Sequence, residues 1–293
     1  MKNWAYHHWI PHLHKSPFKQ RYIAGSAKCS TKPLSKLLTC ILLAVKTELQ
    51  SYCDTNYSMG TRGGENQMWI QTNSKDLLEY IQSRSLSSCN SITTFYFSIL
   101  YTTIPHSKLK EKLRELVQLY FIKKNGQRIY KCLVLGMDRS FLVKKTTRIL
   151  PTNSLKLISS TCLSCWLTTY LLSLVDVFFN RQSTYLLTDL FLYSYEADFI
   201  QGLLKKNEKK LARSFNFTFR YIDDVISLNN SGFGDFIDRI YPIELEIKDT
   251  TDTDRSVSYL DLHTEIDNEG QLRTKLYDKR WFQFSHCELS IHM

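Results

Sequence analysis

Two adjacent carboxylates, Asp223 and Asp224, are the side chains of this 293-residue sequence best placed for chemistry. Aromatic residues occupy every second position over 215–221 before them, and an apolar run follows at 225–228. A period of two is typical of a β-strand, and paired aspartates favour a tight turn. The pattern therefore predicts a hairpin with both carboxylates at its tip. Such a pair suits Mg²⁺, which binds carboxylates and substrate phosphates. A solvated turn is the alternative.

The elements around this hairpin are expected to be helices and strands in mixed order. Apolar residues at three-four spacing predict helices at 33–52, 74–81 (capped by Ser74), 109–120, 188–204 and 232–240, with a loop at 54–64. Aromatic and β-branched residues predict strands at 94–103, 215–221, 225–228, 259–266 and 272–276, and a hairpin or extended pair at 127–143. This order predicts an α+β fold, an antiparallel sheet with helices on one face.

The net charge is +10 with a pI of about 9.1, which favours an anionic partner, with nucleic acid first. A solubilising surface charge is the alternative, and the basic stretch at 9–26 is either a phosphate cradle or a solvated loop. Of the 8 cysteines only Cys162 and Cys165 form a C-x-x-C, which without a second pair does not indicate zinc. The amino terminus lacks the apolar core of a signal peptide, so we expect an intracellular protein, nuclear or cytoplasmic and not secreted.

The segment 145–187 differs from the rest of the chain. Positions 157–175 carry no charge over 19 residues, a length near that of a membrane span. Seven of these residues are Ser or Thr and two are Cys, and no clean periodicity emerges. A membrane-associated protein with a span at 157–175 is therefore one hypothesis.

Four segments, in order, resemble the reverse transcriptases of Penelope-like retroelements. P-H-L-H-K…R-Y-I at 11–23 is similar to their fingers motif, and F-Y-F-S-I-L-Y-T-T-I-P-H at 95–106 is similar to their first palm motif. R-Y-I-D-D matches the second carboxylate motif, and Y-L-D-L…G-Q-L-R-T-K-L-Y-D-K-R at 259–280 resembles the hairpin that follows it. The resemblance implies RNA-directed DNA polymerase ancestry and a partial polymerase right hand, with fingers and an antiparallel palm sheet and the thumb missing.

The resemblance also implies roles for particular residues. Asp223 and Asp224 would lie at the Mg²⁺ site, with Asp223 the more direct ligand. Lys15 and Arg21 would contact the incoming triphosphate, and Tyr101 would lie under the sugar, where its bulk selects deoxynucleotides. The implied partners are an RNA template, a DNA primer and deoxynucleoside triphosphates.

By the same resemblance the chain divides into a fingers-like region at 1–93, the first part of the palm at 94–144, an unpatterned segment at 145–187, the rest of the palm at 188–280 and a non-matching tail at 281–293.

Departures from the family pattern predict an impaired enzyme. The palm aspartate falls on Tyr96, a phenol whose pKa near 10 prevents it from replacing a metal-bridging carboxylate at neutral pH. His12 replaces a lysine, and the G-x-P-M-G loop is absent, with 145–187 in its place. We hypothesise that 145–187 and 281–293 are out-of-frame translation of a decayed element. Two alternatives are a non-catalytic nucleic-acid-binding remnant and a fragment that does not fold stably.

Overall fold

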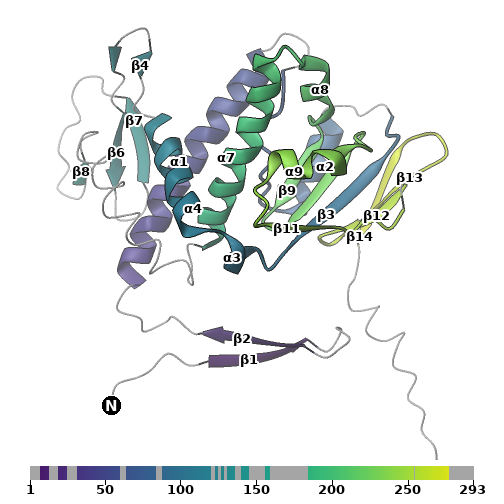
Figure 1. Cartoon of the computed structure of the whole chain (residues 1–293), viewed down its shortest axis with the longest axis horizontal. Coiled ribbons are helices and arrows are strands. Elements are labelled where there is room, and N and C mark those ends of the chain that lie inside the picture. Colours follow the sequence, from purple (N-terminus) through teal and green to yellow (C-terminus); the bar gives the residue numbers. More distant parts are fainter. Residues whose placement is uncertain are drawn as a thin grey trace, which may run out of the picture.

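The computed structural model describes residues 7–12, 19–24, 32–59, 64–83, 88–119, 123–124, 127–128, 131–135, 140–144, 156–158, 184–253 and 255–276. Figure 1 shows long helices on one side of a central sheet and a second, smaller sheet on the other. The helices are α1 (Lys32–Met59), α2 (Ser74–Ser83), α3 (Leu100–Thr103), α4 (His106–Leu119), α7 (Thr184–Lys205), α8 (Lys209–Ser214) and α9 (Ile237–Ile240), with the 3₁₀ turn η2 (Phe233–Phe236) before α9.

The central sheet has four antiparallel strands in the order β11-β3-β10-β9. These strands are β3 (Ile92–Ser98), β9 (Thr218–Tyr221), β10 (Asp224–Leu228) and β11 (Glu246–Asp249). The chain from Trp69 to Gln71 extends the outer edge of β9, because the N–H of Arg220 donates to Trp69 O and the N–H of Gln71 donates to Arg220 O, at 2.7 and 2.8 Å. The antiparallel sheet that the sequence predicts is therefore present.

Smaller sheets surround this centre. Strands β12 (Ser256–Tyr259), β13 (Leu262–Ile266) and β14 (Leu272–Leu276) form one antiparallel sheet. The others are β1 (His7–His12) with β2 (Lys19–Ala24), β4 (Lys123–Lys124) with β5 (Gln127–Arg128), and β7 (Ser140–Lys144) with β6 (Lys131–Leu135) and β8 (Lys156–Ile158). The β6–β7 pairing confirms most of the hairpin or extended pair predicted at 127–143, although residues 127–128 pair with β4 instead.

Both faces of the central sheet are buried. Phe95, Phe97 and Val225 project from one face into a core shared with α1, α4 and α7. From the other face Phe219 and Ile226 join a second core formed with α2 and the β12–β13 strands. The prediction of helices on one face is therefore right for the three long helices but incomplete, because α2 and a second sheet cover the other face.

Two predicted strands are interrupted by residues in the left-handed region of backbone space. The strand predicted at 94–103 ends at Ser98, because Ile99 has φ 56 and the chain then forms α3, which buries Leu100. The strand predicted at 259–266 is broken after Tyr259, because Leu260 has φ 56 and the chain reverses into β13. The residue types favour strand at both places, and the tertiary core overrides that preference.

Other element boundaries also differ from the sequence expectation. Helix α1 continues to Met59, through the first part of the loop predicted at 54–64, and Gln50 donates a hydrogen bond to Asp54 one turn later at 2.9 Å. Helix α7 begins at Thr184 instead of position 188, and β9 begins only at Thr218 because residues 215–217 form a turn.

No helix in the described ranges has the length and apolarity needed to cross a bilayer. The segment 157–175 falls outside those ranges except for its first two residues, which lie in β8. The structure therefore does not test the membrane span predicted there.

Candidate active site at the acidic hairpin

The predicted hairpin is confirmed. Strands β9 and β10 pair with Asp224 opposite Tyr221, so the connecting turn consists of Ile222 and Asp223. Ile222 has φ 55, a left-handed conformation that crowds the side chain of a β-branched residue. Such a conformation persists only where surrounding contacts fix it. The turn that carries the acidic pair is therefore held in place by its neighbours.

The register of the central sheet places Tyr96 beside the acidic pair. Asp224 lies directly opposite Tyr96 of β3 on one side and Tyr221 of β9 on the other. Directly opposed residues project to the same face with Cβ atoms about 4.5–5.5 Å apart. The N–H of Phe97 donates to the carbonyl of Asp223 at 2.9 Å. The hairpin tip and β3 are thus neighbours, as the sequence predicts.

A buried tyrosine from the second sheet lies near Asp224. Tyr259 is 2% exposed, and its hydroxyl donates to Gln71 Oε1 at 3.3 Å. Burial and then the negative charge of Asp224 raise the pKa of Tyr259 far above its ordinary value. Its phenol therefore stays neutral and acts as a hydrogen-bond donor at neutral pH.

On the opposite face, Arg220 anchors the base of the hairpin. Its side chain is fully buried, and Nε donates to Glu196 Oε1 at 2.6 Å while Nη1 donates to Asp189 Oδ1 at 3.0 Å. Nη1 also donates to the carbonyl of Ile222 in the turn at 3.1 Å. Burial alone would lower the pKa of Arg220, but the charges of Glu196 and Asp189 outweigh burial and raise that pKa.

Two further side chains complete this group, which we call the buried ion cluster (Lys46, Asp189, Glu196, Arg220 and Tyr241). Lys46 Nζ donates to Asp189 Oδ2 at 3.0 Å, and the hydroxyl of Tyr241 donates to Glu196 Oε1 at 2.9 Å. Burial and then the charge of Glu196 raise the pKa of Tyr241. Two positive and two negative charges balance, so the cluster ties α1, α7 and β9 together without net charge.

The donor set at the tip suits one hard cation better than two. Two carboxylates can hold a Mg²⁺ ion that also binds substrate phosphates. A pair of ions about 3.5–4 Å apart needs a further bridging carboxylate, and Tyr96 offers a phenol there. In the part of the chain that the structure describes, no group of three or more His, Cys, Asp or Glu side chains is arranged to hold a metal ion.

The other predicted site residues have different outcomes. Tyr101 is half-buried in α3 and does not end a strand, which corrects the predicted placement. The backbone of Arg21 lies in β2 opposite Ile10, in a hairpin that Figure 1 shows apart from the central sheet. Lys15, the C-x-x-C pair and the tail at 281–293 lie outside the described residues.

Sequence reasoning assigned no role to the buried ion cluster. One signal was available, because Asp189 and Glu196 lie among the apolar positions of a mostly apolar helix, and buried charges are rare unless they are paired. Nothing local in the sequence indicates that their partner is Arg220 or that Lys46 joins them.

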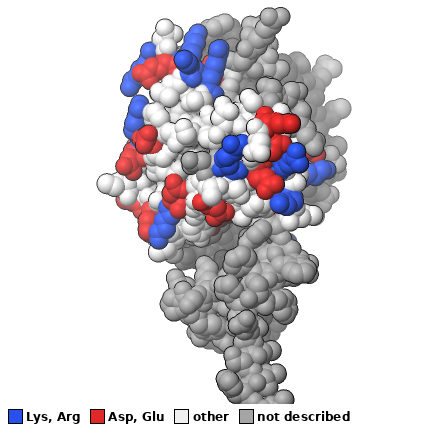
Figure 2. Space-filling view, turned by 90° about the vertical axis from the view of Figure 1, so that its right-hand side faces the viewer, with Lys and Arg blue, Asp and Glu red and all other residues white. Residues whose placement is uncertain are grey.

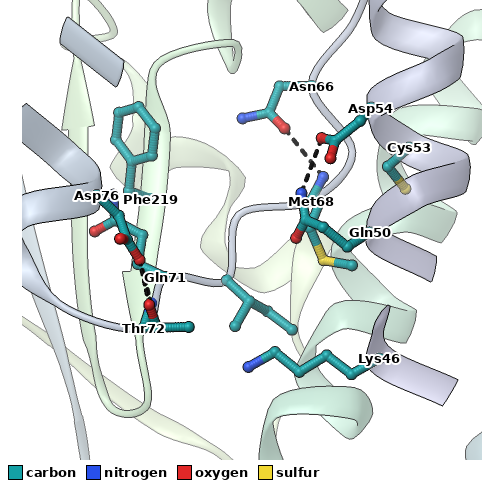
Figure 3. Close-up of a pocket in the computed structure, with 11 residues that line it drawn as sticks. Lys46, Gln50, Cys53, Asp54, Asn66, Met68, Gln71, Thr72, Asp76 and Phe219 are labelled. Atoms are coloured by element: carbon teal, nitrogen blue, oxygen red, sulfur yellow. Dashed lines mark hydrogen bonds between the residues drawn. The ribbon is translucent and has the colours of Figure 1, made fainter. Parts of the chain in front are cut away.

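A cavity of about 370 Å³ lies between α1, the segment before α2 and β9 (Figure 3). It is lined by Lys46, Gln50, Cys53, Asp54, Asn66, Met68, Ile70, Gln71, Thr72, Asp76 and Phe219. Several of its polar groups are used internally. For example, Asn66 Oδ1 accepts from the N–H of Met68 at 3.0 Å, and Asp76 accepts from Thr72. These side chains therefore bond to one another within the wall of the cavity.

Comparison with known proteins gives a likeness of fold. No protein-family model and no curated protein matches the chain. The structure of apo telomerase from Candida tropicalis is similar with a TM-score of 0.51 and 10% identity, covering 93% of this chain and 48% of that one. Telomerase from Candida albicans, in complex with the TWJ fragment of telomeric RNA, has a TM-score of 0.47 and 11% identity, covering 92% and 46%. The chain spans about half the length of these telomerase chains and, as the first comparison shows, has a fold like part of telomerase, a member of the reverse transcriptase family.

Proposed function

We propose that the chain is a reverse transcriptase-like domain derived from a Penelope-like retroelement, intracellular, and impaired as an RNA-directed DNA polymerase. The observation that carries the proposal is the register of the central sheet, which sets Asp224 opposite Tyr96. The acidic pair is on a hairpin beside β3, where such a polymerase needs it, and the residue next to it is a phenol. The telomerase-like fold supports the ancestry.

In this proposal Asp223 and Asp224 would hold Mg²⁺ together with the triphosphate of a deoxynucleotide. When bound, Mg²⁺ supplies positive charge that stabilises the oxygens of the transferring phosphate. The chain fixes Asp223 in the turn and Asp224 at the start of β10, and the register of β3 and β10 brings the Tyr96 position opposite Asp224. Lys15 and Arg21 would contact the triphosphate, and Tyr101 would lie under the sugar, with an RNA template and a DNA primer as partners.

The expected impairment has a definite size. Loss of a carboxylate that bridges two ions removes several kcal/mol of transition-state stabilisation, and about 4 kcal/mol corresponds to about 10³-fold in rate. Tyr96 does not recover this stabilisation, because a phenol with a pKa near 10 is protonated at neutral pH.

Primer extension on an RNA template, with Mg²⁺ or Mn²⁺, tests the proposal directly. The wild-type chain is expected to extend the primer weakly or not at all, and Tyr96→Asp is expected to raise extension by on the order of tenfold or more. Tyr96→Asn is the matched control, because asparagine has the same size as aspartate but carries no charge. Tyr221→Asp is the positional control, because it places a carboxylate on the other side of Asp224.

Robust extension by the wild-type chain that Asp223→Ala abolishes would overturn the impairment. Equal activity of Tyr96→Asp and Tyr96→Asn would overturn the role given to position 96. The out-of-frame origin of 145–187 and 281–293 is tested separately by translating the gene in its other two frames and looking for a G-x-P-M-G-like loop.

One observation favours a second candidate function, nucleic-acid binding without catalysis. Four lysines are exposed where α7 ends and α8 begins (Lys205, Lys206, Lys209 and Lys210). Figure 2 shows Lys and Arg side chains at the top of the molecule, the end where α8 lies in Figure 1. Each lysine that contacts a phosphate contributes about −0.9 to the slope of log affinity against log salt for B-form DNA.

Binding of an RNA–DNA duplex, measured by fluorescence anisotropy at several salt concentrations, tests this candidate. Replacing the four lysines with glutamine is expected to flatten the salt dependence. Replacing Lys75 and Lys108, which are paired with glutamates elsewhere on the surface, serves as the control. An unchanged slope in the four-lysine variant would remove this surface from the proposal.

A further inference from the structure

The turn that carries the acidic pair contacts a fully buried cation. Arg220 is the second residue before the turn, and its Nη1 donates to the carbonyl of Ile222 at 3.1 Å. Its guanidinium is also held from α7, since Nε donates to Glu196 at 2.6 Å and Nη2 donates to the carbonyl of Asp189 at 3.1 Å. We infer that Arg220 is a positioning residue, which fixes the turn so that Asp223 and Asp224 face their ligand.

The turn needs such a contact because its conformation is unfavourable. Ile222 has φ 55, and a β-branched side chain is crowded there. A hairpin with glycine at this position would adopt the same backbone without help. Here the carbonyl of Ile222 accepts a hydrogen bond from an ionised donor, which is stronger than a bond between neutral groups. The donor itself cannot move freely, because two carboxylates of α7, those of Asp189 and Glu196, hold it.

The shape of the arginine side chain matters as well as its charge. A planar guanidinium with five N–H groups can bond Glu196, Asp189 and the turn at the same time, whereas a lysine ammonium has one nitrogen. Lys46 provides the comparison inside the same cluster, because it enters through Asp189 Oδ2 on the side of α1. Removing Lys46 and removing Arg220 both disturb the cluster, but only Arg220 has the bond to Ile222.

The inference rests on the proposed function, because positioning matters only if the acidic pair has a ligand. Its test does not, because the position of the turn is visible in the free protein. The N–H of Phe97 donates to the carbonyl of Asp223, so its hydrogen exchange reports the turn. The N–H of Leu228 donates to the carbonyl of Phe217 at 3.0 Å, at the end of the β9–β10 hairpin far from the turn. Its hydrogen exchange therefore reports general opening of the sheet.

Amide hydrogen exchange is measured by NMR on the metal-free, template-free chain. In Arg220→Lys the exchange of Phe97 is expected to accelerate about tenfold more than that of Leu228, as the loss of a charged hydrogen bond implies. In Lys46→Met the ratio of the two rates should stay within about twofold of wild type. If Arg220→Lys does not fold, Asp189→Asn replaces it, because Asp189 Oδ1 holds the same nitrogen that contacts the turn.

Equal acceleration of both amides in the Arg220 variant would show a general loss of stability and overturn the inference. Protection of Phe97 that is unchanged in that variant would overturn it too, and so would a change in Lys46→Met as large as in Arg220→Lys. The exchange experiment contains neither metal nor nucleic acid, so a failure of primer extension does not affect its result. Likewise, a failure of the exchange experiment does not affect the result of primer extension.

Discussion

Glu196→Gln is expected to be one of the most destabilising near-isosteric substitutions in the chain. Glu196 is fully buried and accepts hydrogen bonds from Arg220 and from the hydroxyl of Tyr241. Glutamine keeps one acceptor oxygen, but its amide group turns N–H toward Nη2 of Arg220, which is 3.4 Å from the present Oε2. The substitution therefore sets donor against donor and removes a charge.

The magnitude follows from the charges of the buried ion cluster. With Glu196 neutral, the fully buried Arg220 keeps only Asp189, a carboxylate that it shares with the partly exposed Lys46, so its charge is only partly compensated in the interior. Breaking a buried ion pair in this way costs about 3–5 kcal/mol. Since domains are stable by about 5–15 kcal/mol, the loss is a large share of the total.

Urea unfolding followed by circular dichroism measures this loss. Tyr241→Phe removes one hydrogen bond from the same carboxylate and should cost about 1 kcal/mol. Glu244→Gln is the matched control, because it is the same substitution in an exposed ion pair with Lys108, and it should leave the unfolding midpoint unchanged. A cost for Glu196→Gln below about 1 kcal/mol, or no larger than that of Glu244→Gln, would refute this account of the cluster.

Three other predictions concern the surroundings of the site. The cap of α2 is Asn73 and not the expected Ser74, because Asn73 Oδ1 accepts a hydrogen bond from the N–H of Asp76. Asn73→Ala removes this acceptor and should cost about 1 kcal/mol in thermal unfolding. No loss would mean that the cap is dispensable. Burial would raise the pKa of Asp76, but hydrogen bonds from Thr72 outweigh burial and lower that pKa. Urea unfolding should therefore show that Asp76 stabilises the fold at pH 6 and stabilises it less as the pH falls below 3.8. A difference in unfolding free energy between wild type and Asp76→Asn that stays constant with pH would contradict this. Gly270→Ala should cost about 1–2 kcal/mol because Gly270 has φ 80, whereas Gly232→Ala at φ −88 should cost less, and equal losses in thermal unfolding would refute the argument.

The hairpin could be predicted from sequence because its signals are local. Alternation before Asp223 and the apolar run after it fix a strand, a turn and a strand, and the structure confirms them. The neighbouring strand was predicted through the motif that contains Tyr96, and the register confirms that it lies beside the hairpin. What local pattern could not supply is the support behind the tip.

That support depends on contacts between distant residues. Lys46 of α1 and Asp189 of α7 are 143 positions apart, and Arg220 joins them from strand β9. Burial of Asp189, Glu196 and Arg220 is also the opposite of what composition suggests for these residue types. The strand boundaries were wrong for a related reason, because Ile99 and Leu260 adopt left-handed backbone conformations that their strand-favouring side chains do not indicate.

The measurement that tests the central claim most directly is the number of Mn²⁺ ions at the hairpin tip, counted by electron paramagnetic resonance in the presence of a primer–template and a non-hydrolysable deoxynucleotide. Wild type is expected to bind one uncoupled ion that Asp223→Asn removes, and Tyr96→Asp is expected to bind two ions with the spin coupling of a pair about 3.5–4 Å apart. A coupled pair in the wild-type chain, or ions that Asp223→Asn leaves in place, would contradict the account.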